Sequence, residues 1–418
     1  MGTYRIVAVG LLYSLLAACN TVQPSDRDVF GTQARPAGPL RGSAGAARPI
    51  ERNLRPSGNI GARFMAVPVT ALKISKKARQ VEIDRRSYAL EALTVTPPGS
   101  GPFPLAVISH GNPLNAEGRR RTNLRQLLPV AEEFARRGYL SIVFARRGFA
   151  RSGGPYAEDR GVCHGITTET YTRVAREAAK DYAAVIAEAT GDLRVDTTAV
   201  VAVGVSGGGF AVTALASDPP KGLVAIVNFS GGRGAYRDHD NCDAEALAQA
   251  FEMFGRTASV PALWLYSETD RKFWPQLVAA NFSAYTGAGG AARLHMFGPL
   301  WYWPDGHELF FPGGREFWRP ALNVFLADVG AATWVRDPGD PEMPRYPPPD
   351  RLTKAGRGQW LRYLGAPGHK AFAVGPASQF YWSGAHDSVE GAATWATARC
   401  EAQGTPCRVV SVDGAAPE

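Results

Sequence analysis

The sequence is poor in residues that bind metals, with five cysteines and seven histidines among 418 residues. No two cysteines have the Cys-x-x-Cys spacing, and no two histidines the His-x-x-x-His spacing, that zinc sites use. A basic face interleaved with aromatic residues is also missing, as is any familiar nucleic-acid reader motif. We therefore expect no metal, no other cofactor and no nucleic-acid partner, despite a formal net charge of +8.

The positive charge has a simpler explanation. Residues 20–65 hold seven arginines against three acidic residues, and they form a basic stretch that we expect to lie near an anionic bilayer. The rest of the surplus is spread over short clusters, which we expect on solvated helix ends and loop tips. These clusters are Arg119-Arg120-Arg121, Arg136-Arg137 and Arg146-Arg147.

An apolar run from Ile6 to Ala18 follows a single positive charge at Arg5. It is too short to span a bilayer comfortably and predicts an export signal. The run ends in Leu16-Ala17-Ala18-Cys19, which resembles the lipobox of bacterial lipoproteins, where cleavage leaves the cysteine as a lipidated N-terminus. The resemblance implies a signal peptide over residues 1–19 and acyl chains on Cys19 that enter a lipid bilayer. It also implies a place in the bacterial cell envelope, facing the periplasm or the exterior; a plain signal peptide is the alternative.

The composition divides the remaining chain into four parts. Residues 20–65 are rich in Gly, Ala, Pro and Arg and predict a flexible tether, and the Pro-rich residues 336–350 predict a linker. Between them, residues 66–335 predict the main domain, and residues 351–418 a small α+β module. This module resembles small secreted bacterial modules with a Trp-Ser turn, here Trp382-Ser383, and a cysteine-clipped helix, a likeness that implies no activity. Its expected elements are Lys370–Val374, Ser388–Ala402 and Arg408–Val412.

Four cysteines remain beside Cys19, an even number that allows three disulfide pairings in an oxidising compartment. Cys400 and Cys407 flank a short polar turn, so we pair them. By elimination, Cys163 pairs with Cys242.

From Val81 onward, short apolar segments alternate with helix-like segments, which predicts an α/β fold with a mostly parallel sheet covered on both faces. The expected strands are Tyr88–Thr96, Leu105–Ser109, Tyr139–Phe144, Ala199–Val205, Leu223–Phe229, Ala262–Tyr266 and Ala292–Phe297. The expected helices are Thr122–Arg137, Thr168–Thr190 and Gly207–Ser217.

The sequence Gly-Val-Ser-Gly-Gly at residues 204–208 lies where an expected strand passes into an expected helix. This is the Gly-x-Ser-x-Gly nucleophile elbow, in which small neighbours allow a tight turn that exposes the hydroxyl of Ser206. A phosphate-binding turn is the rival interpretation. It would require a Gly-Lys-Ser/Thr or Gly-x-Gly-x-x-Gly pattern, and Ser206 stands where the second glycine would be.

A serine nucleophile needs a base, and the base needs an orienting acid, in the chain order Ser, acid, His. Asp270 and His307 both follow expected strands and fit that order. Of the other six histidines, three precede the acid, one lies inside an expected strand and two lie in the C-terminal segment: His110, His164 and His239; His295; and His369 and His386. Glu268 is the alternative acid, and Asp305 is too close to His307 in sequence to orient it easily. For the oxyanion hole, we expect the backbone N–H of Gly207 and that of Asn112, which follows another strand.

Together these segments resemble the α/β-hydrolase superfamily over about residues 80 to 330, in particular the dienelactone-hydrolase-like and prolyl-oligopeptidase-like serine hydrolases. True dienelactone hydrolases use a cysteine where this chain has Ser206, so lactone opening is not carried over. The sequence also has no long N-terminal propeller of the oligopeptidase type, which disfavours oligopeptide selection. The matching segments are His110-Gly111-Asn112, residues 147–154, the elbow, residues 265–270 and Asp305-Gly306-His307.

The resemblance implies an α/β-hydrolase fold and a serine esterase acting on a small-molecule acyl ester. A serine peptidase of the prolyl-oligopeptidase type, and a non-enzymatic envelope binding protein on the same scaffold, are the alternatives. Aromatic side chains near the acid and base are candidates for the pocket wall: Phe273, Trp274, Trp301 and Trp303.

Residues 231–255 are too few for a large cap over the site, and a Cys163–Cys242 bridge there would rigidify its mouth. Arg233 and Arg237 lie in the same segment, where a substrate acid could meet them. We expect them instead to be salt-bridged arginines on the surface.

Overall fold

The computed structural model describes residues 69–161, 163–298, 305–310, 314–333 and 369–413, with a few isolated positions between them. The predicted signal peptide with Cys19, the tether and nearly all of the linker lie outside the described residues. Within the described part of the chain, no helix is both long and apolar enough to cross a bilayer.

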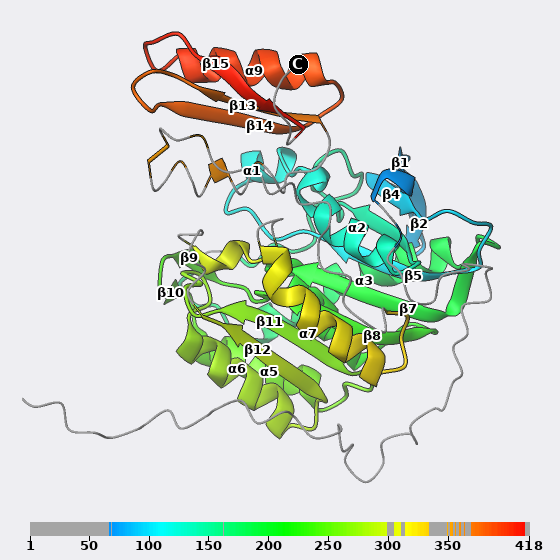
Figure 1. Ribbon diagram of the computed structural model, residues 1–418. Coiled ribbons are helices and arrows are strands. Elements are labelled where there is room, and N and C mark those ends of the chain that lie inside the picture. The colour runs from blue at the N-terminus through cyan, green and yellow to red at the C-terminus, as the bar shows by residue number, and fades with distance from the viewer. Residues whose placement is uncertain are drawn as a thin grey trace, which may run out of the picture. The chain divides into compact units, whose positions relative to one another are not determined.

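A central sheet of eight strands has the order β1-β4-β6-β5-β7-β8-β11-β12 (Figure 1). Its first two pairings, β1 with β4 and β4 with β6, are antiparallel, and the other five are parallel. The predicted mostly parallel sheet and the α/β-hydrolase fold are thereby confirmed. The strands are β1 (Lys73–Lys76), β4 (Ala92–Thr96), β5 (Phe103–Ser109), β6 (Leu140–Phe144), β7 (Val195–Val205), β8 (Leu223–Phe229), β11 (Ala262–Ser267) and β12 (Ala292–Phe297).

Side chains of the central strands alternate between two cores, because successive residues of a strand point to opposite faces of the sheet. In β5, Leu105 and Val107 belong to one core and Ala106 and Ile108 to the other. Helices cover both faces, so β5, β6 and β11 are buried throughout. The first core contains residues of α3 (Thr168–Ala189), α4 (Gly207–Ser217), α5 (Ala244–Gly255) and α6 (Pro275–Gly287), and the second residues of α2 (Leu128–Arg136) and α7 (Arg315–Asp328).

Two predicted elements differ in kind from those observed, whereas others differ only in their end residues, most of all β7, which begins at Val195 and not at Ala199. The expected strand Tyr88–Thr96 is divided at Glu91: β3 (Arg86–Leu90) forms a separate hairpin with β2 (Arg79–Ile83), while β4 joins the central sheet. The expected helix Thr122–Arg137 starts with a 3-10 turn, η2 (Leu124–Leu127), because Pro129 favours the first turn of the α-helix that follows.

Smaller elements connect this framework. They are η1 (Val69–Ala71), α1 (Ala116–Arg120), the pair β9 (Ala235–Arg237) and β10 (Asp240–Asn241), and η3 (Gly306–Glu308). The C-terminal module, described by itself, is an antiparallel sheet of order β14-β13-β15 with the helix α9 (Val389–Glu401). Its strands are β13 (His369–Val374), β14 (Phe380–His386) and β15 (Arg408–Val412). The turn expected at Trp382-Ser383 is wrong, because both residues belong to β14 and pair with β13.

Of the three arginine clusters, Arg119-Arg120-Arg121 lies at the end of α1 with Arg120 and Arg121 exposed, as expected, whereas the other two contradict the expectation of solvated positions. Arg136, the last residue of α2, and Arg137 directly after it are buried, and both form ion pairs with the equally buried Glu133, at 3.1 and 2.9 Å. Arg146 and Arg147 are also buried and ion-paired. A buried guanidinium is tolerated when a carboxylate and further hydrogen-bond acceptors compensate its lost hydration.

Both predicted disulfides are present. Cys163 is bonded to Cys242, with Cα atoms 4.9 Å apart, and Cys400 to Cys407, with Cα atoms 6.0 Å apart. The first bridge joins the chain segment before α3 to the β9–β10 segment, 79 residues later, whereas the second closes a separation of only 7 residues inside the module.

The two bridges should differ in their contribution to stability, because a cross-link removes more unfolded-state entropy when it closes a longer loop. Replacing Cys163 and Cys242 together with serine should lower the free energy of unfolding by about 2–4 kcal/mol. Replacing Cys400 and Cys407 with serine should lower the free energy of unfolding by about 2 kcal/mol less than replacing Cys163 and Cys242 does. Urea denaturation of the two double variants tests the order, and a larger loss from the short-loop pair would contradict it.

Candidate active site

Ser206 occupies a sharp turn between the end of β7 and the start of α4. Its backbone has φ 54° and ψ −119°, a conformation that residues with a side chain rarely adopt. The turn is held from both sides: the Ser206 N–H donates to the carbonyl of Phe229 at 2.8 Å, and the Ser206 carbonyl accepts from Phe210 at 3.0 Å. This is the geometry of a nucleophile elbow.

The loop that follows β5 presses directly against this elbow. A Cβ atom on Gly111 would stand 2.9 Å from the Cβ of Ser206. A Cβ on Gly207 would collide with the side-chain oxygen of Asn112. Only glycine allows the two segments to approach so closely, and the approach brings Asn112 and Gly207 together beside Ser206.

Asp270 and His307 are in direct contact. The Nδ1 atom of His307 lies 3.2 Å from Oδ1 and 3.1 Å from Oδ2 of Asp270. The Asp270 side chain is fully buried, and its Oδ1 also accepts the N–H groups of Lys272 and Phe273, at 2.8 and 2.9 Å. These two backbone hydrogen bonds fix the orientation of the carboxylate independently of its contact with the imidazole.

The loop around His307 is fixed by a second carboxylate. Asp305 Oδ1 accepts the backbone N–H of His307 at 3.0 Å and that of Arg271 at 3.2 Å. Asp305 thus positions the backbone of His307, while Asp270 contacts its ring. Glu268, the alternative acid, is exposed.

The surroundings of His307 shift its protonation. Burial disfavours the charged imidazolium, but the charge of Asp270, its hydrogen bond and the nearby Asp305 and Glu308 outweigh that effect. The pKa of His307 is therefore raised above its ordinary value of 6.5. His110 behaves in the opposite way, because burial and the charge of Arg146 lower its pKa to about 3, so its ring stays neutral.

Ser206 and His307 both border two cavities. One, of about 280 Å³, also includes Gly207, Phe273 and Arg233 in its lining. The other, of about 350 Å³, also includes Leu127 and Phe310 in its lining. Asn112 borders both. A substrate bound across Ser206 thus has room on two sides of the hydroxyl.

The predicted pocket aromatics have different positions. Phe273 lines the first cavity, with its ring centroid 5.5 Å from that of His307. Trp274 is partly buried against the core, and its ring lies 6.2 Å from that of His239. Trp301 and Trp303 lie outside the described residues.

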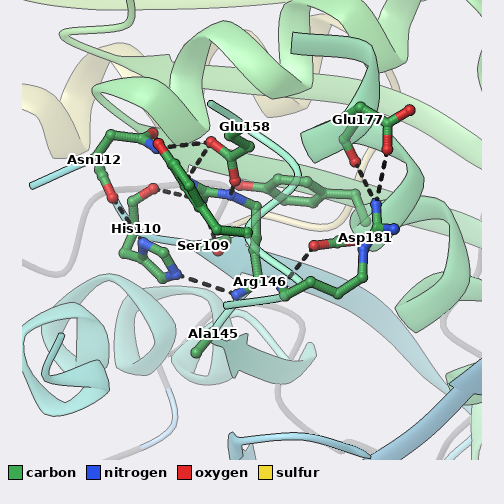
Figure 2. A network of polar contacts seen from close by, with 12 residues as sticks. Ser109, His110, Asn112, Ala145, Arg146, Glu158, Glu177 and Asp181 are labelled. Atoms are coloured by element: carbon green, nitrogen blue, oxygen red, sulfur yellow. Dashed lines mark hydrogen bonds and ion pairs between the residues drawn. The ribbon is translucent and has the colours of Figure 1, made fainter. Parts of the chain in front are cut away.

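A buried ion pair that the sequence analysis missed underlies the site (Figure 2). Arg146 Nε donates to Glu158 Oε1 at 2.5 Å, and its Nη1 donates to Ser109 Oγ at 3.0 Å and to the carbonyl of His110 at 2.6 Å. Asn112 is held between the two charges: its Oδ1 accepts from Arg146 at 3.0 Å and its Nδ2 donates to Glu158 at 2.7 Å. The network fixes the loop that carries Asn112.

Charge pairing sets the ionisation of this network. Burial alone would raise the pKa of Glu158, but Arg146 and Arg233 outweigh it and hold that pKa below its usual value. The Arg146 N–H also donates to Nε2 of the neutral His110, at 3.2 Å, which leaves Nδ1 of that ring to donate to the Gly111 carbonyl, at 2.7 Å.

Arg233 was expected at the surface and is instead buried, with 7% of its surface exposed. Its Nη2 donates to Tyr156 Oη at 2.8 Å and to the carbonyl of Glu158 at 2.6 Å. Arg237, in the same segment, is exposed as expected. The one sequence signal for this network is the position of Arg146, almost directly after a strand that is apolar except for Ser141.

Comparison with protein families finds one match. Residues 88–282, just under half of the chain, match the model of the X-Pro dipeptidyl-peptidase (S15) family. No curated protein matches the chain.

Solved structures with a similar arrangement include a putative dienelactone hydrolase from Klebsiella pneumoniae, at 15% identity and a TM-score of 0.40, covering 62% of this chain and 99% of that one. An esterase from Pyrococcus furiosus has 13% identity and a TM-score of 0.44, covering 63% and 97%. An acylaminoacyl peptidase from Pyrococcus horikoshii has 12% identity and a TM-score of 0.43, covering 64% and 43%. With TM-scores this low, none of them bears on the activity.

The strand order, the turn at Ser206 and the family match agree with one another. The chain has the fold of the α/β-hydrolase superfamily and is similar, over residues 88–282, to the X-Pro dipeptidyl-peptidase (S15) family.

Proposed function

We propose that this protein is a serine hydrolase that cleaves small acyl esters, with Ser206 as nucleophile, His307 as base and Asp270 as the acid that orients the base. The observation that carries the proposal is the contact between His307 Nδ1 and the buried Asp270 carboxylate, in a loop that borders the same cavities as Ser206. The match to a family of hydrolases supports the same chemistry.

The contact with Asp270 assigns the two ring nitrogens of His307. Nδ1 carries a proton toward the carboxylate, so Nε2 is the nitrogen left to accept the proton of Ser206. As that proton transfers, Ser206 Oγ attacks the ester carbonyl and a tetrahedral oxyanion forms. The charge of Asp270 stabilises the resulting imidazolium, in accord with the raised pKa of His307.

The oxyanion needs donors that are already in place. Gly207 is the first residue of α4, where N–H groups have no acceptor within the helix, and we assign its N–H and that of Asn112 to this role. Collapse of the intermediate breaks the ester C–O bond, and the leaving alkoxide takes the proton from His307. Water then attacks the acyl-enzyme by the same route, releasing the acid and restoring Ser206.

A serine peptidase is the second candidate, favoured by the description of the S15 family. The same triad would serve, because acyl transfer from an amide needs the same nucleophile, base and oxyanion hole. Comparing kcat/KM for a 4-nitrophenyl ester and an X-Pro 4-nitroanilide separates the two.

A non-enzymatic binding protein on this scaffold is the remaining alternative. It would not require an activated serine. Covalent labelling by a fluorophosphonate probe, located at Ser206 by peptide mass spectrometry, would exclude that alternative.

Ser206→Ala should abolish turnover of a short-chain 4-nitrophenyl ester, because no other group supplies the nucleophile. We expect kcat to fall by about four orders of magnitude or more. Circular dichroism and the thermal midpoint should remain those of the wild type. Wild-type-like turnover by the folded variant would overturn the assignment.

Asp270→Asn should lower kcat by about three to four orders of magnitude, because the amide cannot stabilise the imidazolium. The matched change Glu268→Gln should leave kcat near the wild-type value, since Glu268 is exposed. If Glu268→Gln is the damaging change and Asp270→Asn is not, the acid is misassigned.

The pH profile of the wild type gives a further check. Only neutral His307 can accept a proton, so activity falls as pH drops through its pKa, which lies above 6.5. In Asp270→Asn the residual activity should fall at a lower pH than in the wild type. Without the charge of Asp270, burial becomes the larger effect on His307 and lowers its pKa. A wild-type profile that falls only below pH 6.5 would contradict the ion pair.

We also propose that the mature protein is lipid-anchored through Cys19 in the bacterial cell envelope. The support is the apolar run that ends in Leu16-Ala17-Ala18-Cys19. Cys19→Ser should remove the protein from the membrane fraction, or leave the precursor uncleaved, and abolish incorporation of labelled palmitate. Membrane partitioning of the variant, together with no palmitate uptake by the wild type, would contradict the anchor.

A further inference from the structure

The first cavity beside Ser206 is lined by more cations than anions. Among the described residues that line it, Asp159 is the only aspartate or glutamate. Four arginine and lysine side chains border the same space: Arg119, Arg160, Arg233 and Lys272. A cavity with this excess of positive charge attracts a negatively charged group.

The imbalance extends beneath the cavity wall. Glu158 is shared by two guanidinium groups: Arg146 reaches its two oxygens at 2.5 and 3.3 Å, and Arg233 Nη1 stands 3.5 Å away. Two buried arginines thus face one buried carboxylate. One positive charge is left in excess next to the cavity.

Arg233 carries that excess. Its Nη2 is fully used by Tyr156 and by the Glu158 carbonyl, but its Nε and Nη1 atoms are buried with no hydrogen-bond partner among the described residues. Nη1 also lies 3.2 Å from the point where a Cβ of Gly207 would stand. The excess charge is therefore adjacent to the elbow.

Other residues of the cavity lining add charge of the same sign as Arg233. Arg160 Nη1 contacts the carbonyl of Gly161 at 3.3 Å and the sulfur of Cys163 at 3.7 Å, contacts that leave its charge in place. Lys272 is paired with Asp238 at 2.9 Å. Arg119 adds a further positive charge over the ring of Tyr156, 3.8 Å from the ring centroid. Arg160 and Arg233 therefore both leave positive charge next to the cavity.

The two segments that carry these cations are joined covalently. Cys163 follows Arg160 by three residues, Cys242 donates its N–H to the carbonyl of Gly234 at 3.0 Å, and the two cysteines are bonded. Because the disulfide holds the two positively charged segments together, the cavity can bind an anion without moving either segment.

We infer that this cavity binds a carboxylate group of the substrate, so that the enzyme selects esters bearing a negative charge near the scissile bond. The inference rests on the proposed esterase function and names its substrate class. A carboxylate would neutralise the excess charge of Arg233 and accept hydrogen bonds from Arg160. A substrate with a free ammonium group would meet repulsion at the same place.

Matched ester pairs test the inference, one pair for each side of the scissile bond. On the acyl side, mono(4-nitrophenyl) terephthalate is compared with neutral 4-nitrophenyl 4-carbamoylbenzoate. On the leaving-group side, 4-acetoxybenzoate is compared with neutral 4-acetoxybenzamide. We expect kcat/KM of the anionic ester to exceed that of its neutral partner about tenfold in at least one pair, with the ratio falling as salt is added.

Arg233→Gln and Arg160→Gln should each reduce that ratio severalfold, and Arg160→Gln, on the cavity wall, covers the case in which Arg233→Gln does not fold. Arg237→Gln is the matched control, because it removes the same charge from the same segment at an exposed residue outside the cavity lining. The control should keep the wild-type ratio.

Binding separates this inference from the proposed function. Ser206→Ala should bind an anionic ester about tenfold more tightly than its neutral partner in calorimetric titration. Turnover of neutral esters with no charge preference would overturn the inference and leave the esterase intact. Preferential binding without turnover by the wild type would retain the anion site and reject the esterase. Equal binding in both pairs, or a preference that survives both cavity variants, would overturn the inference.

Discussion

The buried ion pair between Arg146 and Glu158 is the constraint on which the site depends. Arg146 stands just beyond the end of β6, and its guanidinium reaches across to the end of β5, where it contacts Ser109 and His110 (Figure 2). Through Asn112 the pair fixes the loop that faces Ser206. Removing one partner of such a pair leaves a buried charge and typically costs about 3–5 kcal/mol. Stability and the shape of the site are therefore set by the same contacts.

The parts of the molecule that could be predicted from the sequence depend on neighbours in the chain. Strand β8 and helix α4 have the predicted bounds, because both are apolar segments between clear turn signals. The elbow was predictable for the same reason: its glycines, its serine and its flanking elements are contiguous. The positions of Asp270 and His307 followed from the expected order of strands, since loops after parallel strands meet at one edge of the sheet.

What escaped prediction depends on contacts between distant residues. Glu158 follows Arg146 by 12 residues, and Arg233 follows Glu158 by 75. No local pattern joins them, and the usual preference of arginine for solvent predicted the opposite of what is found. Helices α5, α6 and α7 were also overlooked, although α5 has the ordinary signal of an aspartate, Asp243, capping its first turn at 2.8 Å.

Burial of arginine does not by itself mark a functional site in this chain, as a second cluster demonstrates. On α2, burial opposes ionisation of Glu133, yet arginines of α2 and α7 outweigh it and hold its pKa at about 2. Arg319 of α7 contacts Glu133 at 3.2 Å, so this cluster fastens two helices on one face of the sheet. The described lining of the two cavities beside Ser206 includes neither residue. The Glu158 cluster differs because Arg233 borders a cavity next to the nucleophile, where an excess charge can act on a substrate.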